Sequence, residues 1–114
     1  SKNEKVKTFS KELNHYLDIL SKFTDWINDK NKIEKDDVSA AANDYLKSLG
    51  YVSIAYAWTK ILEVSFNDFN TNKEFYSDKI NTAKFYFDKV LPRAEYHYKS
   101  AISGSSNIMN FKFN

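Results

Sequence analysis

The stretch FYSDKINTAKFYFDKVLPRAEYHYKSAISGSSNIM, residues 75–109, decides the fold of this chain of 114 residues. Its apolar residues recur at the spacing of one helix face. They are Tyr76, Ile80, Ala83, Phe87, Val90, Leu91, Ala94, Tyr98, Ala101 and Ile102. Pro92 falls inside this stripe, has no amide to bond the carbonyl of Asp88, and costs an unbroken helix about 3 kcal/mol. The stretch therefore predicts a long helix that is kinked or broken in two near Pro92, and Gly104 suits the left-handed position just past its end.

Two further helices are predicted before this stretch. Over residues 2–28, apolar residues three and four positions apart form a heptad seam; they are Val6, Phe9, Leu13, Tyr16, Leu20, Phe23 and Ile27. A second stripe predicts a helix over 37–66, with inward positions Val38, Ala41, Tyr45, Leu49, Val52, Ala55, Tyr56, Thr59, Leu62 and Phe66. Asp36 or Asp37 is expected to cap this second helix, and Gly50 in its middle is expected to allow close contact with a neighbour.

The third helix is expected over 72–103, because Thr71 and Glu74 match a capping box. An apolar tail, residues 104–114, is expected to fold back onto the bundle. With two glycines and one proline in the whole chain, turn signals are few and the elements must be long. The prediction is one all-α domain over residues 1–114, an up-down bundle of three long antiparallel helices, or of four if Pro92 breaks the third helix fully.

Composition limits the classes of function. The net charge of +2 comes from mixed acidic and basic residues, which favours neither a nucleic-acid groove nor a membrane anchor. The most apolar window, residues 51–66, is interrupted by Lys60 and Glu63 and is therefore interpreted as a buried helix and not as a membrane span. The chain has no cysteine, which fits a reducing cytoplasm. It opens without methionine, as a processed, tagged or excised chain would.

No catalytic, cofactor-binding or metal-binding residue is predicted. His15 and His97 have no partner at metal-ligand spacing, and Glu63 is interpreted as a surface pair with Lys60. The sequence contains no phosphate-binding loop, nucleophile elbow or zinc spacing. Basic residues of the third helix alternate with acidic ones, which indicates a solvated face and does not favour nucleic-acid binding; the basic ones are Lys79, Lys84, Lys89 and Arg93.

The chain carries more aromatic residues than three core-facing stripes require. Apolar surface beyond a domain's own core commonly meets another domain or subunit, so these residues predict a docking surface, with a thick core as the alternative. The candidate docking residues are Phe75, Phe85, Tyr86 and Tyr96 on the third helix, and Tyr51 and Trp58 on the second.

The order and spacing of several short motifs resemble the C-terminal extension of the long bacterial acyl-CoA dehydrogenases, the branch that includes the enzyme acting on 3-methylthiopropanoyl-CoA. The resemblance covers residues 38–109 and, more loosely, the first predicted helix. The motifs are Ala41-Ala42-x-Asp44-Tyr45-Leu46, Gly50-Tyr51-Val52, Trp58, Phe75-Tyr76-x-x-Lys79, Thr82-Ala83-Lys84-Phe85-Tyr86-Phe87, Leu91-Pro92-Arg93, and Gly104 leading to Ile108-Met109.

This resemblance implies a role and no site. Members of the family oxidise an acyl-CoA to the 2-enoyl-CoA, with FAD taking the hydride, through residues that lie upstream of the extension. The chain is then expected to be a non-catalytic domain that packs against the dehydrogenase core of the same polypeptide, its dimer mate, or both, and reaches FAD and acyl-CoA only through that core. The alternative is a stand-alone helical protein-interaction module. A weaker alternative is DNA contact, because relatives in the alkylation response bind DNA through C-terminal helices.

Overall fold

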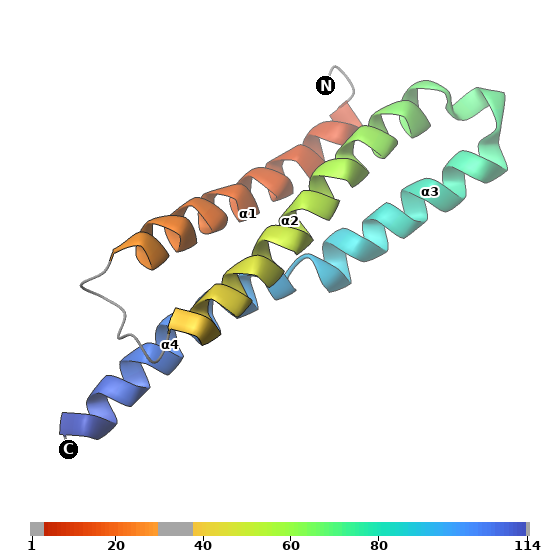
Figure 1. Cartoon of the computed structure of the whole chain (residues 1–114). Helices are drawn as coiled ribbons and strands as arrows, with labels where there is room; N and C mark the ends of the chain where they lie inside the picture. Colours follow the sequence, from red (N-terminus) through yellow and green to blue (C-terminus); the bar gives the residue numbers. More distant parts are fainter. Residues whose placement is uncertain (1–3, 30–37, 114) are drawn as a thin grey trace.

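The computed structural model describes residues 4–29 and 38–113 of the chain, and within them it contains helices and turns but no strand. Figure 1 shows α1 (Glu4–Asn28), α2 (Val38–Asn67), α3 (Lys73–Phe85) and α4 (Arg93–Phe113). A short 3-10 turn, Phe69–Thr71, joins α2 to α3, and a π-helical turn, Tyr86–Val90, joins α3 to α4. The predicted all-α bundle is confirmed.

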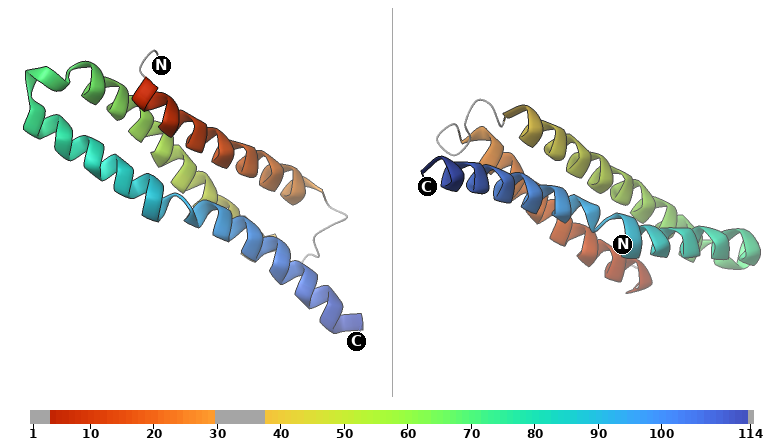
Figure 2. Two further views of the ribbon diagram at one scale, coloured as in Figure 1. Left: turned by 180° about the vertical axis from the view of Figure 1, so that it is seen from behind. Right: turned by 90° about the horizontal axis from the view of Figure 1, so that it is seen from below.

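The helices form an elongated rod of 63 × 21 × 18 Å. The chain runs along α1, returns antiparallel along α2, and returns again along α3 and α4, which together act as one interrupted helix (Figure 2). α2 packs against α1 and against both α3 and α4, whereas α1 meets α4 over a shorter stretch. α2 is therefore the helix that every other helix contacts.

The interruption lies where Pro92 was expected to cause it. The Leu91 amide donates to the carbonyl of Tyr86, five residues back, at 2.8 Å, and the Ala94 amide donates to the carbonyl of Leu91 at 2.9 Å. A π turn inserts one residue relative to an α-helix, so the chain reaches proline with its preceding amide still bonded. Pro92 then stands immediately before α4, where a missing amide costs little.

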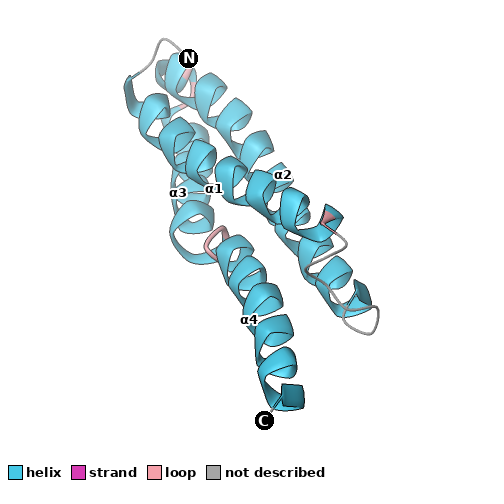
Figure 3. Cartoon of the chain, turned by 90° about the vertical axis from the view of Figure 1, so that its left-hand side faces the viewer, coloured by secondary structure: helices cyan, strands magenta, loops and turns pink. Residues whose placement is uncertain are grey.

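Two predicted helix ends are wrong. α4 continues past Gly104 to Phe113, and no glycine in the described part of the chain has a positive φ. The segment expected to fold back as a tail instead prolongs α4 past the start of α2 (Figure 3). At the start of α3 the cap is Asn72, whose Oδ1 accepts from the Phe75 amide at 3.2 Å, while the Thr71 hydroxyl donates to the carbonyl of Asp68. The proposed caps Asp36 and Asp37 lie outside the described residues.

The core consists of two apolar clusters along the rod. The larger joins all four helices and contains Leu13, Val52, Ala55, Leu62, Ala83, Tyr86, Phe87, Leu91 and Ala94. The smaller contains Phe23, Ala41 and Ala101. The predicted stripe on α2 is wrong at two positions, because Leu49 and Tyr56 are 38% and 55% exposed. The inner side of α2 instead includes the buried residues Ser48 and Ser65, which the predicted stripe did not contain.

Gly50 does not serve close packing, contrary to the sequence prediction. It is exposed in the middle of α2, and a Cβ built there meets nothing within 4 Å. Since a mid-helix glycine costs conformational entropy relative to alanine, this position lowers the stability of α2 without a compensating contact inside the described part of the chain.

Replacing Gly50 by alanine is expected to raise the free energy of unfolding by about 0.5–1 kcal/mol, because the methyl group has open space and the backbone is helical. Urea denaturation followed by circular dichroism measures the change. Ala57→Gly, at another exposed position of α2, is the matched reverse and is expected to lower stability by a similar amount. If G50A instead lowers the free energy of unfolding, Gly50 must take part in a contact that lies outside the described chain.

Candidate docking surface

The six predicted docking residues divide into three groups. Phe75, Phe85 and Tyr96 are exposed, at 49%, 61% and 66%. Tyr51 and Trp58 are half-buried and pack against the larger core cluster. Tyr86 is buried, so its assignment to the docking surface is wrong.

The π turn explains the error at Tyr86. Counting at 3.6 residues per turn places Phe87 inside and Tyr86 beside it on the surface, but the inserted residue rotates both rings toward the core. The Tyr86 hydroxyl donates to the carbonyl of Tyr51 on α2 at 2.6 Å. Burial, followed by the neighbouring Tyr51, raises the pKa of Tyr86 to about 12. Tyr86 is therefore a core residue that ties the interruption to α2.

This shift predicts a stability change in alkali. A tyrosine whose pKa is higher in the folded than in the unfolded state stabilises the fold fully below its unfolded pKa, near 10, and loses that contribution as the pH rises toward 12. The free energy of unfolding should therefore fall over this range. Denaturant titrations at stepped pH test this, and Tyr86→Phe should remove part of the slope. An identical slope in both proteins would contradict the assignment.

A further apolar surface, which the candidate docking residues did not define, covers the solvent side of α2. We call it the α2 outer face and define it by the exposed large residues Leu46, Leu49, Ile54, Tyr56, Ile61 and Val64, which are 38–63% exposed. Between them lie the exposed small residues Gly50, Ser53 and Ala57. The charged residue within this face is Lys60, whose Nζ lies 5.4 Å from the centroid of the Tyr56 ring. It makes no ion pair with Glu63 in the described structure, contrary to the predicted surface pair.

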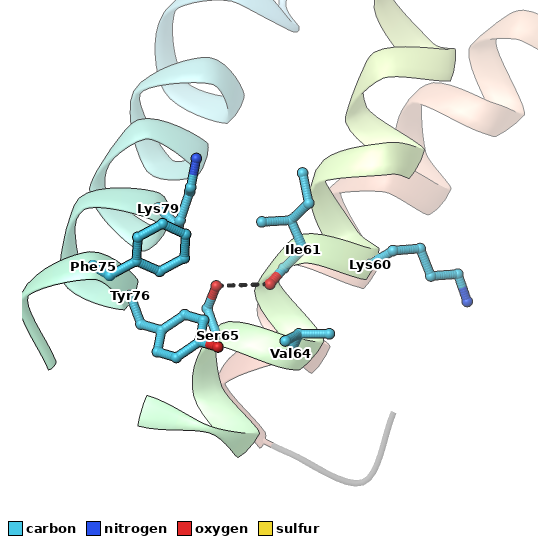
Figure 4. A pocket seen from close by; sticks show the side chains of 7 residues that line it. All are labelled: Lys60, Ile61, Val64, Ser65, Phe75, Tyr76 and Lys79. Carbon is cyan, nitrogen blue, oxygen red and sulfur yellow. Dashed lines mark hydrogen bonds between the residues drawn. The ribbon is translucent and has the colours of Figure 1, made fainter. Parts of the chain in front are cut away.

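A groove extends this face toward α3. Figure 4 shows Ile61 and Ser65 on α2 opposite Phe75 and Tyr76 on α3, and Val64 also belongs to the lining. Its volume is about 480 Å³, and Lys60 and Lys79 complete its lining. The Nζ of Lys79 lies 5.2 Å from the centroid of the Phe75 ring. The exposed Phe75 therefore belongs to the same continuous apolar surface as Ile61 and Val64.

Both histidines connect α4 to other helices. The Nδ1 of His97 lies 2.8 Å from Oδ1 of Asp44 on α2, and the His97 ring stacks on that of Tyr51. The Nε2 of His15 on α1 lies 3.3 Å from Oε1 of Glu95. A hydrogen bond from Lys99 lowers the pKa of Glu95. These contacts join helices, as expected of structural histidines.

Within residues 4–29 and 38–113, the structure does not bring reactive side chains together into one site. Among the described residues, no group of three or more histidine, cysteine, aspartate or glutamate side chains is placed to hold a metal ion. None of the described helices is both long and apolar enough to cross a lipid bilayer. What the geometry offers is a broad apolar helix face with an adjoining groove, the surface of a helical docking domain.

The family to which the chain belongs is consistent with a helical docking domain. The chain belongs to the family described as acetyl-CoA dehydrogenase C-terminal like, whose model matches residues 1–112. This match confirms the resemblance to acyl-CoA dehydrogenase C-terminal domains at the level of the family. Searches of curated proteins and of solved structures give no match.

Proposed function

We propose that this chain is the non-catalytic C-terminal domain of a FAD-dependent acyl-CoA dehydrogenase of the long bacterial type, and that it serves packing and assembly. The observation that carries the proposal is the α2 outer face, six large apolar side chains exposed along one side of the central helix. In the full-length enzyme the core would bind FAD and oxidise acyl-CoA to 2-enoyl-CoA, and this domain would contact that core or its dimer mate.

The energetics support burial of this face. Covering apolar surface is worth roughly 25 cal/mol per Å², so a helix face with six half-exposed large residues gains several kcal/mol when a partner covers it. A domain that stayed alone would keep this surface in water. The cytoplasm is proposed as the location, because a chain without cysteine needs no oxidising compartment.

Deleting the domain from the full-length enzyme tests the proposal. We expect the truncated enzyme to retain its flavin absorbance while its oligomeric mass or thermal stability falls, and we expect the isolated 114-residue chain to bind no FAD and to oxidise no acyl-CoA. Ile61→Glu in the full-length enzyme should weaken assembly, whereas Leu17→Glu, an exposed leucine of α1, should not. Flavin binding or acyl-CoA turnover by the isolated chain would overturn the proposal.

A further inference from the structure

We propose that the α2 outer face packs against the same face of a second copy of this chain, with the two α2 helices antiparallel and the two-fold axis crossing the face at the level of Ala55, between Ser53 and Ala57. The inference rests on the proposed assembly function and names the partner of that surface. Three features of the face, its profile of side-chain size, its symmetry and its one charged residue, support this partner over an unrelated helix.

The first feature is the profile of side-chain size along the helix. The small residues Gly50, Ser53 and Ala57 lie along the centre line of the face, and Leu46 and Val64 stand at its two ends. Ile54 and Tyr56 lie at its two lateral edges, because successive residues of a helix are 100° apart. Two packed helices cross at an angle, so they are closest at the crossing point and diverge on either side of it. Small side chains at the centre and large ones toward the ends fill a gap of that shape.

The second feature is the symmetry of this profile. Each large residue has a counterpart equally far from Ala55 on the other side, in the pairs Leu46 with Val64, Leu49 with Ile61, and Ile54 with Tyr56. In an isologous contact both subunits use the same patch, so antiparallel α2 helices bring the two members of each pair to the same level. A non-identical partner helix imposes no such relation on the positions of the large residues.

The third feature concerns Lys60. It lies as far from Ala55 as Gly50 does, so in the proposed dimer it comes level with Gly50 of the second copy. The space around Gly50 is open, which leaves room for the aliphatic stem of the lysine while its ammonium group reaches water. The one charged residue of the face therefore meets the one residue without a side chain.

The groove between α2 and α3 falls within the same contact. Leu46 of the second copy comes level with Val64, at the edge of the groove that Phe75 and Tyr76 line. Covering the six large residues in both copies buries roughly 1,000 Å², about the area at which a specific interface becomes stable. The groove adds to this area, which places the contact at the lower end of the range for specific interfaces.

Cysteine cross-linking of the 114-residue chain tests both the partner and its direction, because the chain has no cysteine of its own. Ala57→Cys lies close to the axis and should form a disulfide-linked dimer under mild oxidation. Leu46→Cys and Val64→Cys, which are about 27 Å apart along the helix, should not link alone but should link to each other when mixed. Self-linking of Leu46→Cys would indicate parallel helices and overturn the proposal.

Sedimentation equilibrium provides the second measurement. The parent chain should show a dimer, and Ile54→Glu should weaken it by about a hundredfold or more because a carboxylate would be buried without a partner. Leu17→Glu is the matched control and should leave the dimer intact, and circular dichroism checks that both variants remain helical. A monomeric parent chain overturns this inference, whereas the proposed assembly function then still stands if Ile61→Glu weakens the full-length enzyme.

Discussion

Replacing Phe87 by alanine is expected to lower the free energy of unfolding by about 3–5 kcal/mol, the cost of emptying a large buried aromatic site. Phe87 is 2% exposed and packs edge-to-face on Phe9 of α1, with ring centroids 5.1 Å apart. Its removal therefore creates a cavity in the larger core cluster and separates α1 from the π turn. Thermal and urea denaturation of the purified variant measure the loss.

Phe85→Ala is the matched control, two positions earlier in the same segment. Phe85 is 61% exposed and its side chain makes no capping hydrogen bond to the π turn, so its removal is expected to change stability by about 0.5 kcal/mol or less. Equal losses in the two variants would mean that the π turn does not set which aromatic residues face inward. The pair thus tests the rotation of the segment as well as the core.

Ser48→Ala is expected to lower the free energy of unfolding by about 1–3 kcal/mol. The Ser48 hydroxyl is buried and donates to the carbonyl of Ala94 at 2.7 Å, linking α2 to the first turn of α4. Alanine removes the donor and leaves a buried carbonyl without this partner. The gain in helix propensity, about 0.5 kcal/mol, offsets only part of the loss.

Ser65→Ala separates the bond between helices from a general effect of removing a hydroxyl. Ser65 is as buried as Ser48, but its hydroxyl donates to the carbonyl of Ile61 in its own helix. Since that carbonyl keeps its place in the helix, we expect S65A to change stability by less than about 0.5 kcal/mol. If S65A lowers the free energy of unfolding as much as S48A does, the hydrogen bond between α2 and α4 contributes no more than one within a single helix.

The helical architecture could be predicted because the spacing of apolar residues and the position of proline act on the backbone near them in the sequence. The seam of α1 and the interruption near Pro92 follow from the spacing of residues and from the missing proline amide. The end of α4 could not be predicted in this way. Gly104 has the residue type of a helix stop, but a glycine also adopts helical φ angles, and here it does so.

The docking surface was predicted less well than the fold, and for two physical reasons. The π turn shifts the helical phase by one residue, so Tyr86 turned inward against an expectation based on a constant period. On α2, leucine, isoleucine and valine also occur outside the inward stripe, so the pattern located most of the inner side but did not show that the outer side is apolar too. The buried Ser48 and Ser65 and the exposed Leu46 reversed the usual rule that apolar residues face inward.

The short link between α2 and α3 has a consequence for the order of folding. The turn Phe69–Thr71 and the Asn72 cap separate two helices that pack directly on each other. Closing so short a loop costs little chain entropy, and contacts near in sequence form fastest. We therefore expect the α2–α3 hairpin to form early in refolding and to offer the template on which α1 and α4, joined by more distant contacts, assemble afterwards.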